Sequence, residues 1–193
     1  MKRIFALLFC LLFTGCASMG GDSMTLSPAQ LTQKEEQMVQ LLTPNQGILL
    51  DFAADEQLKS LSVSIKELDG TQWVSVGGGS YGLEDSSGRI ALQFDLLDEG
   101  LRTAIQTKNY FVSSNNFKPE KSDREGLAWG STILSDSVPL EYETEIPVAI
   151  QAFTTGSFYS TGVSAYYEPE QLAERGYTKV LALTITFSTQ QLT

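Results

Sequence analysis

Histidine is absent from this chain of 193 residues, and cysteine occurs only twice, at Cys10 and Cys16. Without histidine the chain cannot assemble a Ser-His-acid triad or a zinc site with histidine ligands. Because both cysteines lie near the amino terminus, the rest of the chain has no disulfide, no thiol nucleophile and no cysteine metal ligand. We therefore expect no catalytic residues, no metal and no cofactor, and a fold that is stabilised by its hydrophobic core.

Basic residues are also scarce. The chain has 13 Lys and Arg against 23 Asp and Glu, which gives a formal net charge of −10 at pH 7. Such a surface repels phosphate backbones, and we therefore expect no nucleic-acid partner.

The amino terminus has the order of a secretion signal. Lys2 and Arg3 precede the uncharged apolar run Ile4 to Phe13, which is too short to span a hydrocarbon layer of roughly 30 Å. The segment Phe13-Thr14-Gly15-Cys16 resembles the lipobox of bacterial lipoproteins, with Phe13 where that family prefers Leu, Val or Ile. The resemblance implies that residues 1–15 are a cleaved signal peptide and that Cys16 carries the lipid. It also implies a protein of the bacterial cell envelope, anchored to a membrane and facing its extracytoplasmic side.

The residues that follow predict a flexible tether over 16–26 and then one amphipathic helix over about 28–42. Ser27 suits the N-cap, Pro28 the first helical position and Gln30 the third position of a capping box. Apolar residues share one side of this helix, which we expect to lie on the domain: Leu31, Met38, Val39, Leu41 and Leu42. Residues 27–193 are expected to form a single domain with this helix at its start.

From Ile48 onward the apolar residues alternate with polar ones, and turn residues recur every eight to twelve positions. This spacing, without any alternation of strands and helices, predicts a mostly β fold, an antiparallel β-sandwich or a jelly-roll-like domain. A two-residue turn at Asp69-Gly70 would pair Ile65 with Val74 and Val63 with Val76 on the inner face. The same register places Trp73 beside Lys66 on the outer face.

Two short patterns match the residues of catalytic motifs but lack the structural context that those motifs require. The run Gly77 to Gly82 contains both G-x-G-x-x-G and G-x-S-x-G, but either motif requires a helix directly after it. A second turn and a strand follow instead. We interpret this run as a flexible glycine loop at one end of the sandwich.

Carboxylates are the other candidates for chemistry. Glu141, Glu143 and Glu145 alternate along a proposed edge strand over 138–150 that contains Pro139 and Pro147. On one strand face they would lie about 6 to 7 Å apart, a spacing compatible with a carboxylate-dependent glycan hydrolase. A solvated edge that discourages pairing with other chains is the favoured interpretation.

Aromatic residues give the better binding hypothesis. Candidate ligand-binding residues are Trp73, Tyr159, Tyr166 and Tyr167, whose rings suit stacking on sugars or packing on a protein partner. In the alternative interpretation, the amino-terminal helix covers Trp73 and the tyrosines cap the core. The sequence thus predicts a non-catalytic, lipid-anchored binding or structural module, with a glycan hydrolase or a carbohydrate-binding surface protein as the alternative. It leaves the ligand and the oligomeric state open.

Overall fold

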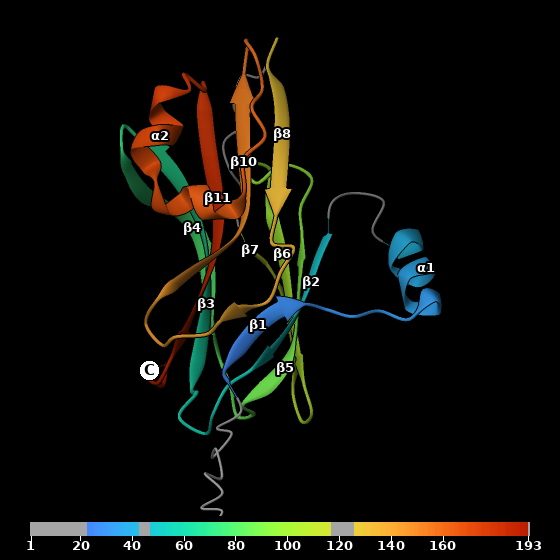
Figure 1. The fold of residues 1–193 in the computed structure, drawn as a ribbon. Coiled ribbons are helices and arrows are strands. Elements are labelled where there is room, and N and C mark those ends of the chain that lie inside the picture. The colour runs from blue at the N-terminus through green and yellow to red at the C-terminus, as the bar shows by residue number, and fades with distance from the viewer. Residues whose placement is uncertain (1–22, 43–46, 117–125, 193) are drawn as a thin grey trace, which may run out of the picture.

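The computed structural model describes residues 23–42, 47–116 and 126–192. Two antiparallel sheets pack face to face, and the predicted β-sandwich is therefore confirmed (Figure 1). Cys16 and the predicted signal peptide lie outside the described residues. In the described part of the chain, no helix has the length and apolar character that crossing a membrane requires.

The strands divide into two sheets. Sheet A has the order β7-β6-β5-β2-β1-β9, with bounds Phe111–Asn116, Leu101–Thr107, Ser87–Gln93, Gly47–Ala53, Thr25–Pro28 and Val138–Pro139. Sheet B has the order β4-β3-β11-β10-β8, with bounds Gln72–Gly82, Ser60–Asp69, Lys179–Ser188, Glu145–Thr154 and Ala128–Ile133. The described residues also form the short helices α1 (Gln33–Leu42), η1 (Val163–Tyr167) and α2 (Pro169–Glu174).

The main core lies between the sheets, where alternate residues of each strand point inward. On β3 these are Leu61, Val63 and Ile65, all fully buried. One buried polar side chain joins the layers, because Gln151 Oε1 accepts a hydrogen bond of 2.8 Å from the backbone N–H of Leu97. A buried amide without such a partner would cost about 1 to 3 kcal/mol.

A second, smaller core lies on the outer face of sheet B. There η1 and α2 place Tyr166 and Leu172 over the strand residues Ile150, Ala152, Val180 and Ala182. The helical cover of this sheet therefore comes from the carboxyl-terminal part of the chain. Sequence analysis assigned that role to the amino-terminal helix.

The amino-terminal boundaries were wrong. Thr25 and Leu26, predicted as the end of a tether, belong to β1, which lies between β2 and β9 with Leu26 fully buried. Pro28 ends this strand and does not begin the helix. The next residue, Ala29, donates its backbone N–H to Leu49 O of β2 at 2.8 Å. Neighbouring amides of a strand point in opposite directions, so the nitrogen of Pro28 faces the β9 side. Strand β9 pairs with Thr25 and Leu26 and not with Pro28, so the missing N–H of proline costs no hydrogen bond between strands.

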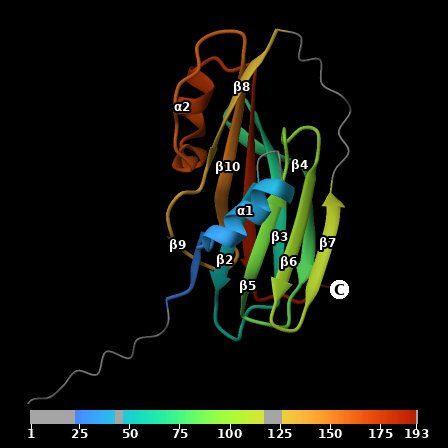
Figure 2. The ribbon, with the colours of Figure 1, turned by 90° about the vertical axis from the view of Figure 1, so that its right-hand side faces the viewer.

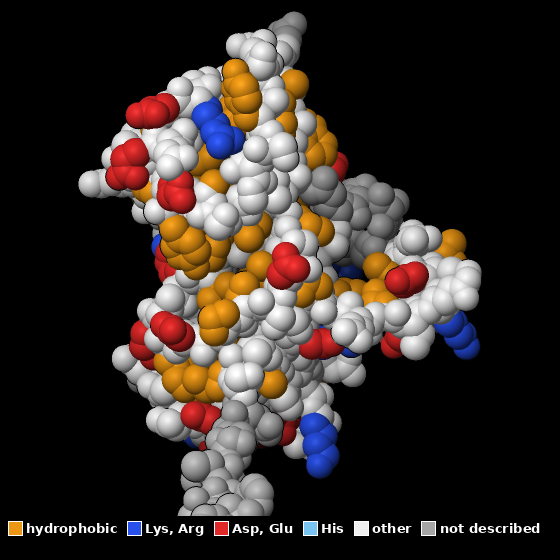
Figure 3. Space-filling model, viewed as in Figure 1, with side chains coloured by type: hydrophobic (Ala, Val, Ile, Leu, Met, Phe, Trp, Pro, Cys, Tyr) orange, Lys and Arg blue, Asp and Glu red, His pale blue; other side chains and the backbone are white. Residues whose placement is uncertain are grey.

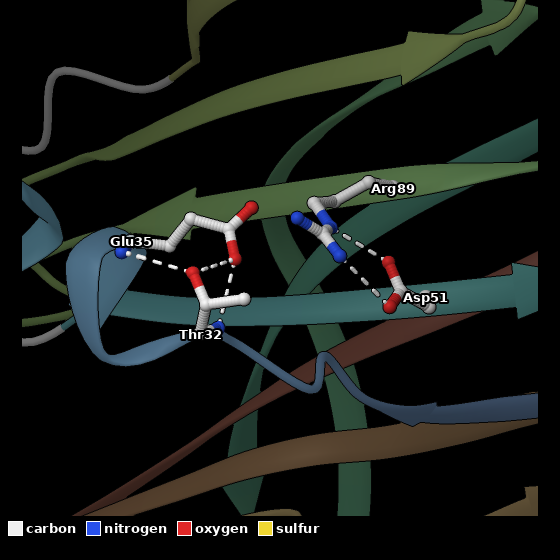
Figure 4. A network of polar contacts seen from close by, with 4 residues as sticks. All are labelled: Thr32, Glu35, Asp51 and Arg89. Carbon is white, nitrogen blue, oxygen red and sulfur yellow. Dashed lines mark hydrogen bonds and ion pairs between the residues drawn. The ribbon is translucent and has the colours of Figure 1, made fainter.

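The capping box stands five residues later than predicted. Thr32 donates its backbone N–H to Glu35 Oε2 at 2.8 Å, and Thr32 Oγ1 accepts from the backbone N–H of Glu35 at 3.4 Å (Figure 4). This reciprocal pair is the T-x-x-E form of the motif, which the sequence offers beside Ser27-x-x-Gln30. It fixes the start of α1 at Gln33.

The β3–β4 hairpin has a different register from the predicted one. Asp69 pairs with Gln72, so the turn is Gly70-Thr71, with Gly70 at a φ of 62°. A bulge between Ile65 and Lys66, with Val76 as the extra residue of β4, then sets Gly77 opposite Ile65 and Gly79 opposite Val63. Val74 and Val76, predicted to be buried, are 46% and 39% exposed.

The glycine run is therefore part of strand β4 and is not a flexible loop. A methyl group on Gly78 would lie 2.2 Å from the carbonyl oxygen of Val63, so the close approach of the two backbones requires glycine.

The predicted edge strand over 138–150 was also wrong. Its first part is β9, at the edge of sheet A, whereas its second part is β10, in the interior of sheet B between β11 and β8. Pro147 is accommodated within an interior strand because the register shifts between Pro147 and Ala149.

Candidate binding cleft beside α2

The four aromatic candidates fall in three different environments. Trp73 and Tyr166 stack on each other, with ring centroids 4.8 Å apart and planes inclined by 18°. Trp73 Nε1 also donates to the carbonyl oxygen of Tyr166 at 2.9 Å. Trp73 lies outside the main core, as the hairpin predicted, but it faces Leu68 and is covered by η1. These two rings form part of the second core and offer no open platform.

A polar latch holds η1 against sheet B. The hydroxyl of Tyr166 donates to the carboxylate of Glu145, which also forms an ion pair with Lys66. Burial opposes ionisation of Glu145, but the Lys66 ammonium and the Tyr166 hydroxyl hold its pKa below the usual value. Burial and the bond to Glu145 raise the pKa of Tyr166. Both groups therefore keep their bonded forms at neutral pH.

The segment Thr155–Gly162, which joins β10 to η1, is fixed on the edge strand β8. The ring of Phe158 lies over Gly130, where an added methyl group would be 2.4 Å from the ring. Thr132 Oγ1 donates to the carbonyl oxygen of Thr161 at 2.6 Å. The absence of a side chain at Gly130 is what lets Phe158 reach the sheet.

This anchoring presents Tyr159 to solvent. Its backbone is held on both sides by the hydroxyl of Tyr177, which accepts from Tyr159 N at 3.2 Å and donates to Tyr159 O at 3.1 Å. Phe158 lies against Gly130 of the sheet and is still 42% exposed, and the side chain of Tyr159 is 54% exposed. The exposed ring of Tyr159 therefore belongs to a residue whose backbone is held in place by hydrogen bonds.

A wide cleft of about 630 Å³ lies beside this ring, lined by Tyr159, Ser160, Gln171, Glu174 and Arg175. Arg175 Nη1 is buried and, within the described residues, has no hydrogen-bond acceptor. An unmet buried donor costs about 1 to 3 kcal/mol, more when it is charged. Sequence analysis missed Gln171, Glu174 and Arg175, because residues spaced along a single short helix give no distinctive pattern.

Tyr167 lies elsewhere. Its hydroxyl donates to the carbonyl oxygen of Glu145 at 3.2 Å, and its ring borders a separate groove of about 450 Å³. The groove is largely apolar, with Val138, Ile146 and Val163 among its lining residues. The exposed candidates Tyr159 and Tyr167 therefore belong to two different concave surfaces.

The three glutamates do not form a row on one strand. Glu143 has a left-handed φ of 60°, and its Oε1 accepts bonds from Ser188 Oγ at 2.7 Å and Thr189 N at 3.1 Å. Glu145 belongs to the latch, and Glu141 borders the apolar groove. Among the residues that the structure describes, no group of three carboxylate, cysteine or histidine side chains could hold a metal ion.

Comparison of the chain with family models, with curated proteins and with solved structures gives no match. The functional argument therefore depends on the geometry of the chain itself.

Proposed function

We propose that this protein is a lipid-anchored, extracytoplasmic binding module that takes a saccharide ligand in the cleft beside α2, without catalysing a reaction. The observation that carries the proposal is the exposed ring of Tyr159 in a cleft that is otherwise lined by the polar side chains of Ser160, Gln171, Glu174 and Arg175. A hydroxyl-rich ligand supplies acceptors for the guanidinium and an apolar face for the ring.

The lining of the cleft favours a saccharide over an apolar peptide. Ser160, Gln171 and Glu174 add a hydroxyl, an amide and a carboxylate, all of which exchange hydrogen bonds with sugar hydroxyls. Only one ring is exposed among them, whereas sites for apolar ligands are lined mainly by hydrophobic side chains.

The ordered backbone of Tyr159 also supports binding. Rigid presentation of a contact residue reduces the conformational entropy that binding must otherwise remove, about 0.5 to 1.5 kcal/mol for a mobile side chain. The Tyr177 hydroxyl and the packed ring of Phe158 supply that rigidity before any ligand arrives.

The same lining argues against glycoside hydrolysis in this cleft. Such enzymes commonly use two carboxyl groups, about 5 to 10 Å apart. The lining of the cleft contains one carboxylate, Glu174, and the carboxylates of Glu143 and Glu145 are engaged in structural bonds.

The proposed anchor at Cys16 fits the position of the cleft. Nine residue steps separate Cys16 from Thr25, which limits their separation to roughly 32 Å at about 3.6 Å per residue. Strand β1 begins at the end of the sandwich opposite α2, as Figure 1 shows. The cleft would then face away from the membrane, toward glycans of the envelope or beyond it.

Calorimetric titration of the purified protein with envelope glycan fragments tests the binding proposal. We expect saturable binding without turnover, and at least a tenfold loss of affinity for Tyr159→Ala and for Arg175→Gln, because each removes about 1.4 kcal/mol or more. Tyr167→Ala is the matched control, since it removes an exposed tyrosine outside the cleft. Absence of saturable binding, or an equal loss for the control, contradicts the proposal.

Mass spectrometry of the mature amino terminus tests the anchor separately. We expect an acylated Cys16, and release or misprocessing of the protein with Cys16→Ser. An unacylated mature terminus in the wild-type protein would contradict the anchor and leave the saccharide site as a separate question.

A further inference from the structure

A second concave site lies on the opposite layer of the molecule, under α1. This helix stands on the outer side of sheet A, as the two ribbon views agree (Figures 1 and 2). A cleft of about 340 Å³ is lined by Val39 of the helix and by residues of β2, β5 and β6. It is the size of a small-molecule site.

The floor of this cleft is formed by apolar side chains, two of which are the small side chains of alanines. The strand registers align Leu49 with Ala91 and Ala91 with Ala104, so one row across three strands has only one large side chain. Two alanines side by side leave room above the sheet, and among the α1 side chains that the structure describes Val39 lines the cleft.

One end of the cleft carries a positive charge. The next row across the strands is Gly47, Gln93 and Arg102, all of which line the cleft. Arg102 is its one charged lining residue, and in the described part of the chain no ion pair involves it. Arg89, on the same face, is in contrast bound to both carboxylate oxygens of Asp51, at 2.7 and 3.0 Å (Figure 4).

The first turn of α1 lies beside β5, with Glu35 on the side of Arg89 (Figure 4). Hydrogen bonds from Thr32, with a smaller contribution from the charge of Arg89, hold the pKa of Glu35 below its usual value, so Glu35 is ionised at neutral pH. The capping box between Thr32 and Glu35 orders this first turn.

We propose that this cleft binds a single-chain amphiphile with an anionic head, such as a fatty acid. The acyl chain lies between Val39 and the row Leu49, Ala91 and Ala104, and the head group pairs with Arg102. Charge complementarity selects this ligand, because Arg102 stands at one end of a largely apolar cleft and, within the described residues, has no ion pair. The site is independent of the saccharide cleft and does not rest on the proposed function.

Displacement of a fluorescent fatty acid, dansyl-undecanoic acid, measures this binding on the full-length protein. We expect laurate to compete at least tenfold better than dodecanol, which has the same chain without the charge. Arg102→Gln should remove that preference by weakening laurate alone. Arg175→Gln, in the saccharide cleft, is the matched arginine control and should leave laurate binding unchanged.

Two further variants test the apolar part. Ala104→Leu fills the cleft and should weaken laurate and dodecanol alike by at least tenfold. Val39→Glu places a carboxylate on the exposed helix, where it cannot disturb the sheet, and should weaken laurate more than dodecanol.

Three results would overturn the proposal: no saturable displacement from the wild-type protein, equal competition by laurate and dodecanol, or laurate binding that none of these cleft variants changes.

Discussion

The two outer faces of the sandwich carry their helices in very different ways. On sheet B, η1 and α2 bury a stacked Trp73–Tyr166 pair and close a second core. On sheet A, α1 leaves Met38 53% and Leu41 83% exposed, and of its described side chains only the half-buried Val39 lines the surface below it. The helices on sheet B pack closely and stabilise the fold, whereas α1 covers sheet A only in part and leaves the space in which we propose a ligand.

The space-filling view agrees with this difference. On the side seen in Figure 3, hydrophobic side chains show as separate patches between polar ones, and α1 projects from the body of the molecule. Isolated apolar patches are normal for a soluble surface, so hydrophobic area alone identifies no site. The sites proposed above rest on enclosure and on the polar and charged side chains that line them.

The largest expected effect comes from Trp73→Ala. This change removes the stack on Tyr166 and the bond to its carbonyl oxygen, and we expect a loss of about 3 kcal/mol in the free energy of unfolding. Denaturant titration followed by far-ultraviolet circular dichroism measures it. A loss under about 0.5 kcal/mol would contradict the view that η1 and α2 form a second core. Leu41→Ala on α1 is the control and should change stability little.

A smaller effect is expected from Gly130→Ala. The added methyl group would lie 2.4 Å from the ring of Phe158, which must move. We expect a loss of about 1 to 3 kcal/mol from overpacking, together with weaker saccharide binding through Tyr159. Gly156→Ala is the matched control, because a methyl group there meets only Thr154 Oγ1, at 3.6 Å. Equal stability of the two variants would show that Phe158 does not anchor the segment.

The latch should make stability on this face depend on pH. Glu145 has a lowered pKa in the folded protein, so its stabilising contribution is present above the unfolded value of 4.5 and is lost as pH falls through the folded value. Tyr166 has a raised pKa, so its contribution is present below the unfolded value of 10.0 and is lost at higher pH. Thermal unfolding of Glu145→Gln between pH 2 and 7 should be less sensitive to pH than that of the wild type. An unchanged pH profile would contradict the latch.

The smallest global effect is expected from Thr32→Ala. Loss of the capping box destabilises α1 locally by about 1 kcal/mol, but global unfolding should change little because the described side chains of the helix are mostly exposed. Hydrogen exchange of the α1 amides should rise while exchange of the β3 and β11 amides stays the same. A clear drop in global stability would mean that α1 packs more tightly than its exposure indicates.

The alternation of apolar and polar residues predicted which face of a sheet a side chain occupies better than it predicted which residues of neighbouring strands pair. In β5 and β6, Ile90 pairs with Ile105, and Ile90, Leu92 and Ile105 all point inward and are buried, because the alternation assigns faces whichever residues pair. In β4, by contrast, Val74 pairs with Glu67, and a bulge between Ile65 and Lys66 then shifts the register so that glycines lie opposite Ile65 and Val63; Val74 and Val76 are both exposed.

What the sequence determined by itself follows from local chemistry: the sandwich class from alternation and turn spacing, the outward position of Trp73 from a tight hairpin, and the lack of histidine or cysteine sites from composition. What only the tertiary structure decided depends on contacts between residues far apart in the chain. Glu145 meets Lys66 and Tyr166, Phe158 meets Gly130, and α1 stands over Ala91 and Ala104. No local sequence pattern indicates these contacts. They form because the strand registers, and the crossing of the chain from β9 in sheet A to β10 in sheet B, bring distant segments together.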